Sequence, residues 1–289
     1  MARSVQKVTA TFCIFIGMIT ISGNGLVLLA IVKSKTLRTP TNLFISSLSV
    51  ADLVIGTIAI PISIAGTFTK PQLFYSRLFD FMLAQSFTAS TLNLSIVSFD
   101  RFVAVSFPLR YRTIMTKRKT IAAIVFIWII SLLLSSINLI HFKLATQRKQ
   151  LRLVFTVVMF IIPFLIIMYF YWRIFKVADR QAVIIKRQSR VFQIHIEMSN
   201  NPWKERRAAV TIIIVVGIFA VCWIPNVIMA IIQVCLEASN TCNPNRFKIE
   251  CGWWVTMTVA FANSSLNPFI YAIRNYEFRK AYKKAIFGR

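Results

Sequence analysis

Hydrophobic residues fill seven long stretches of the chain, and each stretch holds few charged positions. The stretches cover roughly residues 9–32, 43–66, 78–102, 120–141, 153–173, 208–235 and 252–273. Each is long enough to cross a bilayer as a helix, which takes ~20 residues. None alternates apolar and polar residues with the period of two that membrane barrel strands show. The pattern therefore predicts an all-α membrane protein, in which residues 1–289 form a single bundle of seven transmembrane helices.

A shorter pattern follows the seventh stretch. Phe278, Tyr282 and Ile286 recur every four residues within 275–287, and Lys and Arg lie between them. This spacing places apolar side chains on one face of a helix and basic side chains on the other. We expect a short amphipathic helix that lies on the cytoplasmic surface of the membrane and contacts its lipids.

The composition excludes several classes of protein. Of the 289 residues, 57% are hydrophobic and 15% are charged, against about 25% charged in ordinary soluble domains. A soluble globule of this size could not bury so much apolar surface. Five cysteines are too few for a disulfide framework. These values exclude a soluble enzyme, a disordered chain and a secreted disulfide-rich scaffold.

The net charge of +25 allows two interpretations, a nucleic-acid partner or basic loops beside an anionic membrane leaflet. Most of the 34 Lys and Arg lie in four segments that flank the spans, at 33–38, 101–119, 173–207 and 274–289. This placement argues against nucleic acid. It predicts a multi-pass protein of the plasma membrane with these segments inside and the N-terminus outside.

Polar residues inside the spans are expensive to bury and are therefore candidates for function. Asp52 lies in the middle of the second span, and Ser90, Asn263, Ser264 and Asn267 lie at a similar inferred depth. Their oxygens suit a hard monovalent cation such as sodium. Alternatively, these residues form hydrogen bonds that only hold the helices together.

The third span ends with Asp100 and Arg101, and the sixth begins near Glu205. An ion pair between Arg101 and Glu205 would join two helices at the cytoplasmic face, with Asp100 as a local alternative partner. The other interpretation is three solvated charges at the membrane surface.

Three spans contain an internal proline, namely Pro163, Pro225 and Pro268. Each removes a backbone hydrogen bond and bends its helix. Trp223, just before Pro225, would transmit pressure from a bound ligand to the bend. The alternative is a packed Trp in a static helix.

Short motifs from all seven spans occur in the order found in one receptor family. They are Gly23-Asn24-Gly25, Leu48 to Asp52, Asp100-Arg101-Phe102, Trp128, Pro163 with Tyr171, Cys222-Trp223-Ile224-Pro225 and Asn267-Pro268-Phe269-Ile270-Tyr271. Over nearly its whole length the chain resembles the rhodopsin-like G-protein-coupled receptors. It looks closest to the adenosine, melanocortin and biogenic-amine branches.

The resemblance implies a receptor that responds to an extracellular ligand by activating a heterotrimeric G protein. Arg101 would insert toward the G protein, Glu205 and Asp100 would restrain it at rest, and Tyr171 and Tyr271 would stabilise the open cytoplasmic face. The full set implied for activation is Asp100, Arg101, Glu205, Tyr171, Tyr271, Trp223, Phe219, Asn267 and Pro268. Asp52, Ser90, Asn263, Ser264 and Asn267 resemble a complete sodium pocket, and no other cofactor is implied.

The resemblance also places the ligand pocket, which is apolar and aromatic. Its lining would be Asp80, Leu83, Ala84, Phe87, Phe155, Met159, Trp223, Asn226, Val227, Trp254, Met257 and Phe261. Amine receptors place an Asp where this chain has Leu83, which argues against an amine. Asp80 resembles an acidic melanocortin position, whose companion acids are missing. The residues leave three classes of ligand open, namely a small molecule, a lipid and a peptide. They also leave open a pocket that is filled by its own side chains and binds no ligand.

The family's usual disulfide at the outer end of the third span is missing, because Ser76 occupies that position. Cys235, Cys242 and Cys251 all lie in the last predicted outer segment, so three pairings are open. We favour Cys235 with Cys242.

Seven spans also occur in two other classes of membrane protein. A seven-helix transporter or ion pump needs ionisable groups along a path through the spans, and only Asp52 lies deep. An intramembrane enzyme needs a pair of His or Asp residues that the spans lack. We therefore predict a receptor that is not an enzyme.

Overall fold

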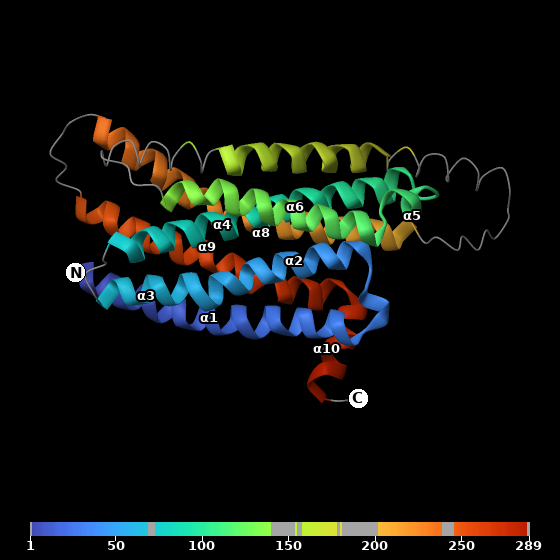
Figure 1. Cartoon of the computed structure of the whole chain (residues 1–289), viewed down its shortest axis with the longest axis horizontal. Coiled ribbons are helices and arrows are strands. Elements are labelled where there is room, and N and C mark those ends of the chain that lie inside the picture. Colours follow the sequence, from blue (N-terminus) through green and yellow to red (C-terminus); the bar gives the residue numbers. More distant parts are fainter. Residues whose placement is uncertain are drawn as a thin grey trace.

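A computed structural model describes residues 2–68, 73–139, 154, 158–177, 180, 202–238 and 246–287. These residues form helices and short turns, with no strand in the part of the chain that is described. Long helices run side by side along the longest axis of the molecule (Figure 1). The prediction of an all-helical bundle is confirmed.

The long helices follow the predicted spans. They are α1 (Ala2–Lys33), α2 (Pro40–Val54), α3 (Ile60–Phe68), α4 (Leu73–Ser106), α6 (Lys117–Ser136), the helical segment Val158–Val177, α8 (Pro202–Ala238) and α9 (Arg246–Arg274). A π-helical turn, η2 (Ile55–Ala59), joins α2 to α3, so these three elements together form the second predicted span.

Short helices mark the ends of the bundle. The single turn η1 (Lys35–Leu37) joins α1 to α2, η3 (Ile137–Leu139) follows α6, and α5 (Tyr111–Ile114) lies between α4 and α6. In Figure 1 the N-terminus lies at one end of the bundle and α5 at the other. We call this second end the α5 end.

Five helical stretches are long and apolar enough to cross a membrane. They are Ser4–Lys33, Pro40–Gly66, Lys117–Leu139, Val158–Val177 and Ile213–Gln233. The helices α4 and α9 also cover their predicted spans but are more polar. Their polar side chains point into the bundle, where Asn93, Asp100, Asn263 and Asn267 are buried. The polar character of α4 and α9 therefore belongs to the interior of the bundle.

Local sequence signals explain where several helices begin. Thr39 accepts a hydrogen bond from the Asn42 backbone N–H at 3.3 Å, and Pro40 occupies the first position of α2. Thr116 caps α6 in the same way through the Lys119 N–H at 3.4 Å. Such caps satisfy backbone donors that have no partner inside the helix.

Two glycines allow close helix contacts. A Cβ atom added at Gly23 would lie 2.9 Å from Pro268 Cγ, so α1 approaches α9 more closely than a larger residue would permit. One added at Gly56, inside η2, would lie 3.0 Å from Ile21 Cγ1 of α1. The Asn24 side chain reinforces the first contact, since its Nδ2 donates to the Ser264 carbonyl at 2.9 Å.

The helix α10 (Tyr276–Phe287) follows α9 and begins beyond Asn275, whose side chain accepts from the Glu277 N–H at 3.0 Å. Phe278 and Tyr282 are buried, and the Phe278 ring centroid lies 5.8 Å from that of Tyr271. The predicted helix is therefore present, and its place on the cytoplasmic surface of the membrane stays a prediction. Ile286 is exposed, because it lies beyond the part of α10 that contacts the bundle.

Candidate functional site

Asp100 and Arg101 form an ion pair near the α5 end of α4. Arg101 Nη2 lies 3.0 Å from Asp100 Oδ2, and the two side chains are 12% and 0% exposed. A carboxylate this deeply buried is costly unless its oxygens accept hydrogen bonds from several donors. The neighbouring elements supply those donors.

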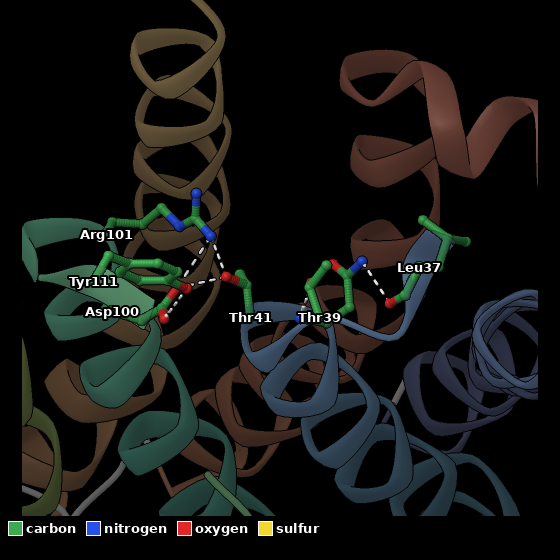
Figure 2. A network of polar contacts seen from close by, with 7 residues as sticks. Leu37, Thr39, Thr41, Asp100, Arg101 and Tyr111 are labelled. Carbon is green, nitrogen blue, oxygen red and sulfur yellow. Dashed lines mark hydrogen bonds and ion pairs between the residues drawn. The ribbon is translucent and has the colours of Figure 1, made fainter. Parts of the chain in front are cut away.

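Thr41 of α2 and Tyr111 of α5 complete the coordination of the carboxylate. The Thr41 hydroxyl donates to Asp100 Oδ2 and also accepts a hydrogen bond from Arg101 Nη2. The Tyr111 hydroxyl donates to Asp100 Oδ1 at 2.8 Å. Figure 2 shows these four side chains converging from three elements of the fold. We call them the Asp100 network.

Tyr111 can act only as a donor to this carboxylate at neutral pH. Burial, followed by the negative charge of Asp100, raises the pKa of Tyr111 to about 12. The hydroxyl therefore keeps its proton, and the hydrogen bond to Asp100 persists. Together the three donors satisfy the oxygens of Asp100, and Arg101 lies beside it.

The network contains the Asp100–Arg101 pair, which the sequence analysis gave as the local alternative to a pair between Arg101 and Glu205. It also contains two residues, Thr41 and Tyr111, that sequence reasoning missed as site residues. No signal in the sequence placed Tyr111 or Thr41 beside Asp100. The backbone of Glu205 lies in α8, but its side chain is outside the described part of the structure. The Arg101–Glu205 pair therefore stays a prediction.

The two predicted tyrosines are both buried in the bundle. Tyr171 faces Ser98 of α4, although no described partner lies within hydrogen-bonding geometry of its hydroxyl. Tyr271 lies against Phe278 and so connects α9 to α10. Both belong to the same large apolar core as Phe219 and Trp223.

A second polar cluster surrounds Asp52 in the middle of the bundle. Asp52 is 0% exposed, and Asn267 Nδ2 of α9 donates to its Oδ2 at 2.8 Å. The Ser264 hydroxyl lies beside the same carboxyl group, outside the geometry of a hydrogen bond. The predicted grouping of Asp52 with residues of the seventh span is thus observed for these two partners.

Several oxygens of α2, α4 and α9, Asp52 Oδ1 among them, are buried without a hydrogen-bond partner among the described residues. They are Asp52 Oδ1, Asn263 Oδ1, Ser264 Oγ, Asn267 Oδ1, Asn93 Oδ1 and Ser49 Oγ. An unsatisfied buried acceptor costs roughly 1–3 kcal/mol. Ser90 is buried as well. These buried oxygens fit as ligands of a small cation with associated water.

Four aromatic side chains, Phe87, Phe160, Phe219 and Trp223, form a cluster inside the bundle. The ring centroids of Phe87 and Trp223 are 4.2 Å apart, and Phe219 lies 5.9 Å from Phe87 and 6.1 Å from Trp223. Phe160, which sequence reasoning did not single out, stacks on Phe219 at 6.2 Å. The cluster joins α4, α8 and the segment Val158–Val177. We call it the aromatic cluster.

The remaining predicted pocket residues are distributed around this cluster. Phe261 is buried in a smaller apolar cluster with Cys13 and Ile60, and Leu83 packs against both apolar clusters. Asn226 and Val227 are buried, whereas Asp80, Ala84, Met159, Trp254 and Met257 are half-buried. Phe155 lies outside the described residues. The Trp223 and Asn226 side chains each keep a buried N–H donor without a partner among the described residues.

The predicted disulfide is not settled by the structure. Cys235 is exposed and Cys251 is half-buried, and both are free thiols in the described part of the chain. Cys242 lies outside the described residues. The pairing of Cys235 with Cys242 therefore stays a prediction.

Comparison with known proteins gives consistent matches. Residues 23–271 match the model of the 7 transmembrane receptor (rhodopsin family). The histamine H2 receptor of Rattus norvegicus is 35% identical, over 92% of this chain and 76% of that receptor. The octopamine receptor beta-1R of Drosophila melanogaster and the alpha-1A adrenergic receptor of Oryzias latipes are each 28% identical. They cover 95% and 91% of this chain, and the matches span 61% and 63% of those receptors.

These matches confirm the seven-helix fold and the resemblance to the biogenic-amine branch. Members of this family are membrane receptors and not enzymes, so the transporter interpretation is not favoured. The names of these relatives do not support the argument against an amine ligand that rested on Leu83. The chain belongs to the rhodopsin family of seven-transmembrane, G-protein-coupled receptors.

Proposed function

We propose that this receptor binds an extracellular ligand beside the aromatic cluster and responds by freeing Arg101 to contact a heterotrimeric G protein. In this arrangement the N-terminus is outside the plasma membrane, and the α5 end faces the cytoplasm. The observation that carries the proposal is the Asp100 network. In it Arg101 contacts its neighbour Asp100 and Thr41 of α2, while Tyr111 of α5 donates to Asp100. The contacts from α2 and α5 to α4 would separate when these elements move apart.

Continuous apolar packing supports a connection between the aromatic cluster and the Asp100 network. Phe87, Phe219 and Trp223 belong to the same apolar core as Tyr171 and Tyr271. A ligand that binds more tightly to one arrangement of this core shifts the population toward it. The response is then set by the difference between the ligand's affinities for the two arrangements.

The test is nucleotide exchange on purified heterotrimeric G protein with the full-length receptor in nanodiscs. We expect the receptor to accelerate exchange, and we expect Arg101→Ala to abolish this acceleration while the variant still reaches the cell surface. Acceleration that survives in a well-expressed Arg101→Ala variant would contradict the role of this residue. A lack of acceleration under every ligand and in their absence would contradict the function itself.

The ligand we propose has an aromatic or apolar body that packs on the aromatic cluster. The relatives are named for histamine, octopamine and adrenergic ligands, so an amine is the first class to test. Leu83 cannot balance the charge of an ammonium group. Asp80, nearly one turn earlier on α4, is the acid we assign to that role.

Histamine and octopamine, assayed beside lipid and peptide panels, distinguish these ligand classes. If an amine activates the receptor, Asp80→Asn should weaken it about tenfold or more, as expected for loss of a charge-assisted hydrogen bond. An amine response that is unchanged in Asp80→Asn would remove Asp80 from the site. Activation only by uncharged lipids would exclude the amine class.

We also propose that sodium binds at Asp52 and stabilises the resting arrangement. Asp52 would balance its charge, and the unsatisfied oxygens of Asn263 and Ser264, with Ser90 nearby, would complete its ligands. Carboxylate, amide and hydroxyl oxygens are ligands suited to hard cations.

A further inference from the structure

Two side-chain contacts join the last part of α8 to the first part of α9. In the first, Trp253 Nε1 of α9 donates to Gln233 Oε1 of α8 at 2.9 Å, and both side chains are half-buried. Gln233 closes the apolar stretch Ile213–Gln233, so this hydrogen bond lies at one boundary of a stretch that is long and apolar enough to span a membrane. Within a membrane, a hydrogen bond of this kind helps to hold two helices together.

The second contact lies about one helical turn nearer the middle of α8. Gly252, next to Trp253, leaves room for the tip of Met229, since a Cβ atom at this glycine would lie 2.7 Å from Met229 Cε and 3.1 Å from its Sδ. Met229 and Gln233 are four residues apart and so share one face of α8. We call Met229, Gln233, Gly252 and Trp253 the α8–α9 clamp. The sequence alone gave none of the four a role.

The clamp and the aromatic cluster lie on opposite sides of Pro225 along α8. Phe219 and Trp223 precede this proline, whereas Met229 and Gln233 follow it. Proline has no backbone N–H and removes a hydrogen bond from the helix, so α8 bends most easily there. The two halves of α8 can therefore move separately, provided that other contacts hold the half after Pro225.

The half after Pro225 is held both by buried packing and by the clamp. Val227 of α8 and Ala260 of α9 belong to the same large apolar core, and Ala230 is buried as well. The clamp lies beyond these residues, where α8 ends and α9 begins, away from the α5 end of the bundle (Figure 1). Helix ends fray most readily. The clamp therefore fixes this half at the place where packing alone holds it least.

We propose that Gln233 and Trp253 are positioning residues, which hold the half of α8 after Pro225 against α9 so that only the half before Pro225 moves. This inference rests on the proposed function, in which the elements around Arg101 separate. With the clamp in place, a displacement of Trp223 bends α8 at Pro225 and is carried toward the α5 end. Without the clamp, part of that displacement moves the half after Pro225, and less of it reaches Arg101.

The experiment measures how firmly the end of α8 is held, by electron paramagnetic resonance on the full-length receptor in nanodiscs. One nitroxide is attached to the exposed Cys235 near the end of α8, and a second to Val8→Cys at an exposed position of α1, which packs against α9. Cys242→Ser and Cys251→Ser prevent labelling elsewhere, and the remaining two cysteines are buried. We call this receptor the labelled parent and expect one narrow distribution of distances between its nitroxides.

Trp253→Phe keeps an aromatic ring and removes the hydrogen-bond donor. We expect it to raise the population of displaced distances about threefold or more, as follows from the loss of one hydrogen bond between helices in a membrane. Gln233→Leu should do the same, whereas Gln233→Glu keeps an acceptor oxygen and should retain the narrow distribution. Thr256→Val is the matched control on the next turn of α9, because the Thr256 hydroxyl donates to the Trp253 carbonyl within the same helix.

A second measurement adds nucleotide-free heterotrimeric G protein to the same samples. The distance in the labelled parent should stay constant, whereas in Trp253→Phe it should shift. Equal distributions in Trp253→Phe and the parent without G protein would overturn the clamp. A shift in the parent on binding G protein would overturn its role in confining the movement. A receptor that fails to bind the G protein contradicts the proposed function instead, and the first measurement then decides on the clamp by itself.

Discussion

At the scale of single residues, the Asp100 carboxylate is the centre of the candidate switch. It accepts hydrogen bonds from Thr41, Arg101 and Tyr111. Each bond contributes on the order of 1 kcal/mol. Removing one hydroxyl donor weakens the resting arrangement and leaves every charge in place. The result should be a measurable shift of the receptor population from the resting toward the active arrangement.

Tyr111→Phe removes one such donor and keeps the ring. We expect ligand-free nucleotide exchange to rise about fivefold, because a loss of about 1 kcal/mol changes the equilibrium by that factor. The measurement is exchange by purified G protein with equal amounts of receptor. Tyr276→Phe is the matched control, since Tyr276 is exposed on α10 and should leave exchange unchanged. Equal basal rates for Tyr111→Phe and wild type would contradict the restraining role of the network.

Asp52→Asn tests the second polar cluster. The amide can still accept from Asn267, but it cannot balance the charge of a cation. We expect replacement of sodium by N-methyl-D-glucamine to raise basal exchange in the wild type and to have no effect in Asp52→Asn.

The control for this prediction is Ser95→Ala, which removes a buried hydroxyl of α4 that bonds only within its own helix, to the Thr91 carbonyl. Its sodium response should remain. A sodium response that persists in Asp52→Asn would exclude this carboxylate as the binding group.

At the scale of helices, the contact between α1 and α9 depends on a glycine. Gly23→Ala places a methyl group 2.9 Å from Pro268 Cγ, and Pro268 is part of a rigid ring inside α9. Overpacking of this kind costs about 1–3 kcal/mol. We expect the Tm of the detergent-solubilised receptor to fall by a few degrees.

Gly25→Ala is the matched control, two residues along the same helix. A Cβ atom there meets no described atom of another element within 4 Å. Alanine also favours a helix over glycine by roughly 0.5–1 kcal/mol. The Tm of Gly25→Ala should therefore stay constant or rise slightly, and an equal fall in both variants would refute the close contact as the cause.

Hydropathy predicted the positions of the helices well, because the cost of exposed backbone in lipid leaves few alternatives. It did not predict the π-helical turn Ile55–Ala59, which follows Asp52 inside an uninterrupted apolar stretch. Nor did it identify Thr41 as a partner of Asp100, since the two residues lie 59 positions apart and meet only through the packing of α2 against α4. Contacts between helices were predictable only where polar residues shared an inferred depth, as Asp52 and Asn267 do, or where a family motif named the residues.

At the scale of the whole molecule, the orientation in the membrane follows from the distribution of basic residues and gives a direct test. The N-terminus and the α5 end lie at opposite ends of the bundle (Figure 1). Cys235, near the end of α8, is exposed, whereas Cys13 and Cys222 are buried. The proposed orientation, with the basic segments inside, predicts that Cys235 faces the outside of the cell.

A membrane-impermeant maleimide applied to intact cells should therefore label the receptor, and Cys235→Ser should reduce the labelling. Cys13 and Cys222 should react only after denaturation, because their thiols are shielded by neighbouring helices. If Cys235 is a free thiol, labelling needs no reductant. If it pairs with Cys242, labelling appears only after mild reduction, and Cys242→Ser makes it independent of reductant. Labelling of Cys235 that requires permeabilised cells would place this end in the cytoplasm, and the assignment of Arg101 to the G-protein face would then be wrong.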